Sequence, residues 1–311
     1  MYKQKEGTIV RIRVPGKIGD RLWMLGLEES CIYVVEGEKE SIIINGGLSY
    51  VAPDLIRQFD QYGIDESRIK GILVLHAHFD HMGIVPFFKR RRPEIRVYGS
   101  ERACEIFKNP KGRRVANEFS RLVAERVGRA QLLDEYDLSW NGDVEGTVLS
   151  EGDCIDLGGA TLRIYETPGH SLCSIAAYMQ ESKALFASDS IGIPFKEIIE
   201  TSPAYNYADY MESLEKLKNL EVDLICADHY GYITGEEARE YVVRTIIAAR
   251  ETYSMMKQTF RRAKSVEKAA EEWTRTFCKE RPDYLLTPEI LKKVNEQIFS
   301  HLAQEPEPAV D

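Results

Sequence analysis

Three of the six histidines of the chain lie within the segment HAHFDH at residues 76–81. His76 and His78 are separated by one residue, and alternate residues of an extended segment point to the same side, so these two imidazoles can bind one metal ion together. Asp80 and His81 follow where the chain is expected to leave a strand, and can turn towards a second ion about 3.5–4 Å from the first. The motif therefore indicates a site for divalent cations.

Two further histidines and one aspartate stand in a similar context, each just after a short β-like run. They are His170 in ETPGHS, Asp189 in FASDS and His229 in CADHYG. In an α/β sandwich the ends of neighbouring strands meet at one edge, so these side chains can converge on the HAHFDH segment. The sixth histidine, His301, has no such context. Imidazole and carboxylate ligands without thiolates accept zinc, iron(II) or manganese.

In type, order and spacing, these residues resemble the HxHxDH, H, D, H series of the metallo-β-lactamase superfamily over roughly residues 20–232. The resemblance implies an α/β fold, the αββα metallo-β-lactamase sandwich, with a two-metal site at one edge of its sheets. It also implies which residues hold which ion. The first ion would be bound by His76, His78 and His170, the second by Asp80, His81 and His229, and both by Asp189.

Hydrolysis is the reaction that such a site predicts. Two divalent ions that share a water molecule lower its pKa towards neutrality and polarise a carbonyl, so a metal-bridged hydroxide can cleave an ester, thioester or lactone bond. Asp80 is the expected catalytic side chain, because it can orient the hydroxide or pass a proton to the leaving group. Two ions are expected, with zinc favoured over iron or manganese. Within the superfamily, Asp189 resembles the glyoxalase II, lactonase, thioesterase and nuclease branches more than true β-lactamases.

The loop at 191–207 follows Asp189 and should border the metal site. Lactonases that cleave acyl-homoserine lactones place a tyrosine after this aspartate, where the chain has SIGIPF, and this disfavours a lactone. An aromatic pocket with one ammonium group suits an acyl or aryl ester, or a thioester with an anionic group. Four side chains of the loop are expected to line that pocket: Phe195, Lys196, Tyr205 and Tyr207.

Two alternatives from other classes stay open. The superfamily also contains mononuclear iron dioxygenases of the persulfide type, which would bind one iron and consume oxygen. A regulatory protein would instead keep a metal site and act through its carboxyl-terminal helices. Partner binding that survives the substitution His78→Ala would favour this last possibility.

The elements that position these residues follow from the hydrophobic pattern. Residues 31–35 and 41–44 predict a β-hairpin, and the apolar run GILVL at 71–75 predicts a strand that is covered on both faces and ends at His76. Further strands and helices follow from the same pattern. Strands are expected within 95–99, 151–165, 184–187 and 222–227, and helices at 53–62, 84–92 and 207–219.

The pattern changes at residue 235, and this change predicts a division of the chain. Residues 1–235 are expected to form the metal-binding domain, with a helical insertion at about 101–137, and residues 236–303 an all-α extension. The extension is expected to contain helices near 236–264, 266–278 and 288–303, which would cap the site or pair two subunits in a homodimer. The tail at 304–311 is expected to be disordered.

Composition narrows the range of partners and compartments. The formal charge of −9 and the pI near 5.4 disfavour nucleic acid, and no run approaches the ~18 apolar residues of a membrane span. We therefore expect a small-molecule substrate, no membrane partner and a cytoplasmic location. The six cysteines stand singly without a CxxC pair, which is typical of reduced thiols. Cys173 is singled out because it lies three residues after His170.

Overall fold

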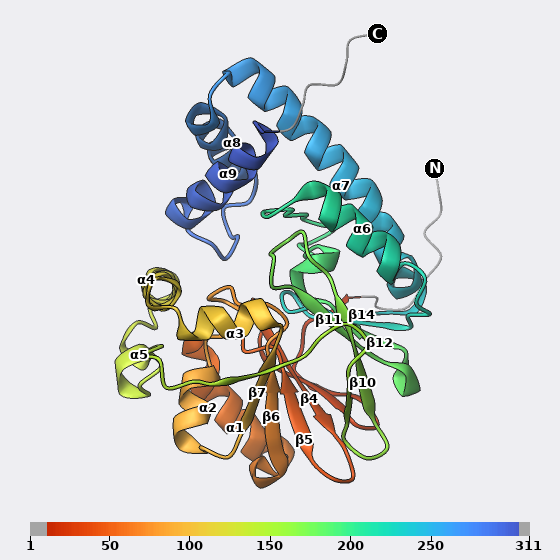
Figure 1. Ribbon diagram of the computed structural model, residues 1–311. Coiled ribbons are helices and arrows are strands. Elements are labelled where there is room, and N and C mark those ends of the chain that lie inside the picture. The colour runs from red at the N-terminus through yellow and green to blue at the C-terminus, as the bar shows by residue number, and fades with distance from the viewer. Residues whose placement is uncertain (1–10, 305–311) are drawn as a thin grey trace.

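The computed structural model describes residues 11–304. Two seven-stranded sheets lie face to face, and helices cover the outer side of each sheet (Figure 1). This arrangement is the αββα sandwich, so the α/β fold expected from the sequence is confirmed. Of the tail expected at 304–311, only Gln304 lies within the described residues.

The first sheet places the HAHFDH segment at one edge. The hairpin expected at 31–44 is present, because β4 pairs with β5 in antiparallel order, and β5 to β8 then run parallel. Parallel neighbours end at the same edge, and residues 76–81 follow β6 there. In order across the sheet the strands are β2 (Gly16–Gly19), β3 (Leu22–Leu27), β4 (Ser30–Glu36), β5 (Ser41–Ile44), β6 (Ile69–Leu73), β7 (Arg96–Gly99) and β8 (Gly146–Val148).

The second sheet places the other candidate ligands. Asp189 follows β12 and His229 follows β13, and these two strands are parallel neighbours, so both residues leave the sheet at the same edge. His170 follows β10 on the same sheet. In order across the sheet the strands are β1 (Arg11–Ile12), β14 (Tyr232–Thr234), β13 (Leu224–Cys226), β12 (Ala184–Phe186), β11 (Ile175–Met179), β10 (Thr161–Glu166) and β9 (Cys154–Asp156).

Side chains that alternate along β4 show how the layers are packed. Ile32 and Val34 pack on one face against the helix layer of α1 (Ala52–Tyr62) and α2 (Val85–Arg91), while Tyr33 and Val35 face the second sheet. All four side chains are fully buried. A strand with both faces covered needs this continuous apolar sequence. The outer face of the second sheet packs against α6 (Tyr207–Leu217) and α7 (Gly235–Ala263).

The helical insertion expected at about 101–137 comprises α3 (Glu101–Lys108), α4 (Pro110–Arg126) and α5 (Gln131–Glu135). It lies on the same side of the molecule as the carboxyl-terminal helices (Figure 1). Arg126 at the end of α4 donates hydrogen bonds to three carbonyls of the segment that joins α8 (Val266–Glu280) to α9 (Pro288–Leu302). The insertion and the carboxyl-terminal helices are thus joined directly.

The helices expected after residue 235 are present as α7, α8 and α9. The first half of α7 shares the core of the second sheet, where Tyr241 and Ile246 pack with Ile225. Its second half packs with α8 and α9 through Met256 and Phe299. The expected boundary therefore falls at the start of a helix that belongs to both parts, and the division into domains stays a prediction.

Short 3₁₀ turns complete the chain at Ser49–Val51, Glu66–Arg68, Gln180–Ser182 and Ser188–Ile191. The last of these carries Asp189. Within residues 11–304, each helix is too short or too polar to cross a bilayer.

Candidate metal centre

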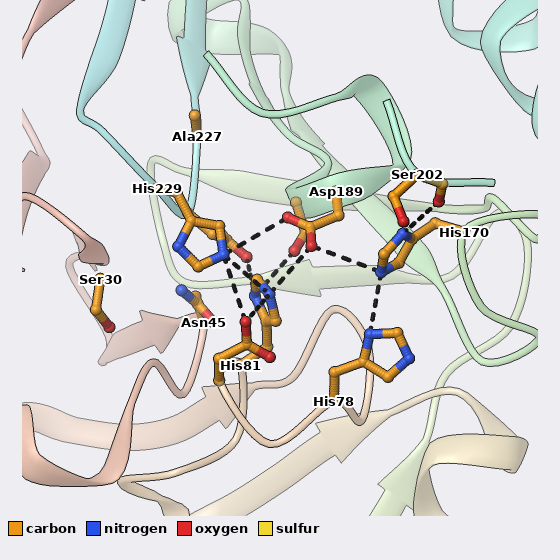
Figure 2. A network of polar contacts seen from close by, with 12 residues as sticks. Ser30, Asn45, His78, His81, His170, Asp189, Ser202, Ala227 and His229 are labelled. Atoms are coloured by element: carbon orange, nitrogen blue, oxygen red, sulfur yellow. Dashed lines mark hydrogen bonds and ion pairs between the residues drawn. The ribbon is translucent and has the colours of Figure 1, made fainter. Parts of the chain in front are cut away.

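All the side chains proposed as metal ligands from the sequence lie together at the edge shared by the two sheets (Figure 2). Although they are far apart in the sequence, these side chains form two adjoining clusters in space. The first cluster contains His76, His78 and His170. The second contains Asp80, His81 and His229.

The first cluster brings three imidazole nitrogens to one point. His78 Nδ1 lies 3.1 Å from His76 Nε2 and 3.0 Å from His170 Nε2. One ligand atom from each residue lies within 4.8 Å of the others. His76 and His170 are buried and His78 is partly exposed, so the cluster is reached from the side of His78.

The second cluster combines two imidazoles with a carboxylate. His229 Nε2 lies 3.2 Å from His81 Nε2, and Asp80 Oδ2 lies 3.6 Å from His81 Nε2 and 3.8 Å from His229 Nε2. The three side chains are buried.

Asp189 stands between the two clusters. Its Oδ2 lies 3.5 Å from His170 Nε2 and 3.4 Å from His81 Nε2, and its Oδ1 lies 3.8 Å from His229 Nε2 (Figure 2). One carboxylate therefore faces ligand atoms of both clusters.

Hydrogen bonds outside the clusters orient the histidines. The Nδ1–H groups of His170 and His229 donate to the carbonyls of Ser202 and Glu29, at 2.7 and 2.6 Å. Because a carbonyl only accepts, Nδ1 carries the proton and Nε2 presents its lone pair to the cluster. His81 Nδ1 lies 2.9 Å from Asp228 Oδ2, which orients the third ring in the same way. The orientation of these three rings suits metal binding.

The charges of the clusters also suit a cation. Burial, and then the neighbouring His170, lower the pKa of His78 to about 3, and burial likewise lowers the pKa of His76. Burial acts to lower the pKa of His81 as well, but Asp189 and Asp80 outweigh it and raise that pKa. Burial opposes ionisation of Asp189, yet His81 holds its pKa well below the ordinary value. His76 and His78 are therefore neutral beside the ionised carboxylate of Asp189, as a divalent metal ion requires, whereas His81 holds a proton that a bound ion would displace. The donor set of imidazoles and carboxylates fits such an ion.

Two residues that support the clusters were not predicted. Asp228 holds His81, and its other oxygen, Oδ1, is buried without a hydrogen-bond partner among the described residues. Ser188 Oγ lies 3.2 Å from His76 Nδ1 and 3.1 Å from His81 Nδ1. The sequence signal for Asp228 was its position directly before His229, whereas a lone serine before Asp189 carries none.

Cys173, singled out because it lies close to His170 in sequence, has a structural role. It is buried, and its Sγ accepts a hydrogen bond from the Ala77 N–H at 3.3 Å. Burial raises the pKa of its thiol, so the reactive thiolate is disfavoured.

A cavity of about 550 Å³ opens onto both clusters. Five of the candidate ligands line it: His78, Asp80, His170, Asp189 and His229. The remaining walls come mainly from α4, α8, α9 and the segment between α8 and α9, and residues of α3, α7 and the loop at 191–207 complete them. Aliphatic and aromatic side chains dominate these walls, among them Val115, Phe119, Trp273, Leu291 and Val294.

The loop side chains expected to line the substrate pocket lie outside this cavity. Phe195 and Lys196 line a smaller cavity of about 390 Å³, Tyr205 packs edge-on against His301, and Tyr207 stacks on Tyr253. The reason is a backbone bridge between Ile193 and Glu200, which folds the loop back on itself. The residues of this loop that line the 550 Å³ cavity are instead Ile193, Glu200, Thr201 and Ser202.

Comparison with known proteins agrees with this geometry. The family model described as "Metallo-beta-lactamase superfamily" matches residues 26–229. The chain is 30% identical to a hydroxyacylglutathione hydrolase of Rhodopseudomonas palustris over 52% of this chain and 49% of that protein. It is 27% identical to the atrochrysone carboxyl ACP thioesterase of Aspergillus fumigatus, over 69% of this chain and 55% of that protein. The solved metallo-beta-lactamase family protein TTHA1429 of Thermus thermophilus superposes with a TM-score of 0.63 at 17% identity, covering 91% and 94% of the two chains.

Proposed function

We propose that this chain, which belongs to the metallo-beta-lactamase superfamily, is a binuclear metallohydrolase that cleaves an ester or thioester bond. The observation that carries the proposal is the meeting of two His/Asp clusters on Asp189 at the end of a largely apolar cavity. Similarity to proteins named hydroxyacylglutathione hydrolase and ACP thioesterase supports hydrolysis as the reaction class.

The residues that would hold the metal ions divide as the clusters do. His76, His78 and His170 would bind one ion and Asp80, His81 and His229 the other, with Asp189 shared. When bound, the ions would lower the pKa of a water molecule and withdraw electrons from the scissile carbonyl. Zinc is the first choice, with iron(II) or manganese as alternatives for the same donors.

Asp80 is the proposed catalytic residue of the chain. Its carboxylate lines the cavity and its side chain is 10% exposed, so it can contact both water and substrate. In the reaction, the oxygen of one water joins the acyl carbon, the carbon–sulfur or carbon–oxygen bond breaks, and the leaving group takes up a proton that Asp80 can carry. A thiolate leaves without a strong acid, which favours a thioester.

The test is a panel of thioesters, aryl esters and lactones with protein loaded with zinc, iron(II) or manganese. We expect thioester or ester hydrolysis, and a loss of about 10²- to 10⁴-fold in kcat for Asp80→Asn because a proton carrier is removed. The exposed Asp20→Asn is the matched control. Absence of hydrolysis, together with oxygen consumption on a persulfide substrate and one iron per chain, would replace this function with that of a dioxygenase.

A further inference from the structure

We infer that the substrate carries an extended apolar group, which lies in the chamber between α4 and the carboxyl-terminal helices, and this inference rests on the proposed function. The chamber is the part of the 550 Å³ cavity that lies away from the clusters. Its walls come from the insertion, which lies within the residues that match the family model, and from α8 and α9, which lie beyond them.

The composition of the chamber walls indicates an apolar ligand. Val115 on α4 is 39% exposed, and its side chain lines the cavity. Facing it are Leu291 and Val294 on α9 and Trp273 on α8. Apolar pockets of 300–1,000 Å³ typically bury most of a drug-sized ligand, so this wall can cover a medium or long acyl chain or an aromatic group.

Two of the three charged side chains in the chamber lining are paired within the protein. Glu200 forms an ion pair with Arg281, and Lys293 pairs with Glu118 at 3.2 Å while lying over the Phe119 ring. Lys111 is exposed. A charged substrate group would find most of these charges already paired and would have to give up its hydration, so the charged part of the substrate is expected near the metal clusters or in solvent.

Hydrogen bonds beside the chamber connect and brace its walls. Arg126 on α4 donates to the carbonyls of Pro282, Tyr284 and Leu286 at 3.2, 3.0 and 3.2 Å. Within the opposite wall, Asn295 on α9 donates to Thr274 on α8 at 2.9 Å. These bonds fix the two walls relative to each other, so an apolar group enters a site that is already formed.

The size of the expected effect follows from the burial of methylene groups. Each methylene that moves from water into an apolar site contributes about 0.8 kcal/mol, which is about a fourfold change in an equilibrium or rate constant. The value of kcat/KM should therefore rise about fourfold for each added methylene until the chamber is full, and then level off.

The experiment uses the metal-loaded full chain and the acetyl, butanoyl, hexanoyl, octanoyl and dodecanoyl thioesters of N-acetylcysteamine. A second series of acetyl esters with lengthening alcohols tests whether the apolar group sits on the acyl side or the leaving side. In parallel, octanoate and acetate are titrated while the fluorescence of Trp273 is followed, with Trp273→Phe to assign the signal. We expect kcat/KM to rise with the length of the apolar chain in one of the two series. We also expect the fluorescence of Trp273 to change when octanoate is added but not when acetate is added.

The matched variants are Val115→Asp in the chamber wall and Val243→Asp on α7, whose valine is 44% exposed and lines neither cavity. We expect Val115→Asp to lower kcat/KM at least tenfold on the octanoyl substrate and by clearly less on the acetyl substrate. We expect Val243→Asp to match the wild type on both. Hydrolysis that is independent of length in both series, or equal behaviour of the two variants, would overturn the inference. If nothing is hydrolysed, the proposed function fails, and the fluorescence titration alone then decides for or against an apolar ligand.

Discussion

Asp228 shows how a single residue outside the clusters can tune a metal ligand. Its Oδ2 accepts from His81 Nδ1, and the carboxylate is fully buried. Such a partner fixes the ring of a ligating histidine and makes its other nitrogen more basic. Its Oδ1 has no hydrogen-bond partner within residues 11–304, and burial of an unpaired carboxylate oxygen is unfavourable.

We therefore predict that Asp228→Asn weakens metal binding about 10- to 100-fold without removing a ligand. Asparagine keeps the shape but removes the negative charge that favours a proton on His81 Nδ1. Competition titration with a chromophoric chelator measures the change, with Asp20→Asn at an exposed site as control. Equal affinities of Asp228→Asn and the wild type would show that this hydrogen bond does not support the centre.

For single residues, the sequence predicts which side chains are candidate ligands, but not which groups hydrogen-bond to those side chains and orient them. His76, His78 and His81 stand out because histidines are rare in the chain and are spaced for chelation. Ser188 and the carbonyls of Glu29 and Ser202 carry no such signal, because any residue offers a carbonyl. Only folding brings them to the rings.

Among the elements, α4 and the segment between α8 and α9 depend on each other. The Arg126 guanidinium is the link, since it binds three carbonyls of residues 282–286. The segment also supplies Tyr284, Leu285 and Leu286 to the cavity wall.

Arg126→Ala should therefore loosen this segment while leaving the metal clusters intact. We expect amide protection of residues 282–287 to fall by about tenfold, because each hydrogen bond contributes about 0.5–1.5 kcal/mol and solvent compensates for part of the loss. Native hydrogen exchange followed by mass spectrometry measures the effect. Arg114→Ala, at an exposed arginine on the same helix, is the control and should leave the segment unchanged. Equal protection in the two variants would contradict the role of Arg126.

Element prediction from the sequence was strong for long periodic segments and weak for short ones. Apolar spacing predicts helices at 53–62 and 207–219 and three more after residue 235. The structure has all of these helices, as α1, α6, α7, α8 and α9. Strands such as β8 and β14 have only three residues, which is too short to show alternation. The sequence left open whether the carboxyl-terminal helices cap the site or pair two subunits, because an apolar stripe on a helix looks the same whether it meets a core, a partner or a ligand.

For the whole molecule, the decisive feature is that each sheet supplies part of the metal centre. The first sheet leads into His76, His78, Asp80 and His81, and the second sheet supplies the rest. The centre therefore exists only when the sandwich has formed, so bound metal should stabilise the whole fold. Pairing of two chains through the carboxyl-terminal helices stays a prediction, and α8 and α9 have another role as cavity walls.

Metal content per chain tests the central claim most directly. Protein purified without chelator, reloaded with zinc and dialysed, is analysed for metal by mass spectrometry beside Asp189→Asn and Asp20→Asn. We predict two ions per chain for the wild type and Asp20→Asn, and one or fewer for Asp189→Asn, because its carboxylate faces both clusters. A wild-type chain that retains one ion or none, or an Asp189→Asn chain that retains two, would contradict the account.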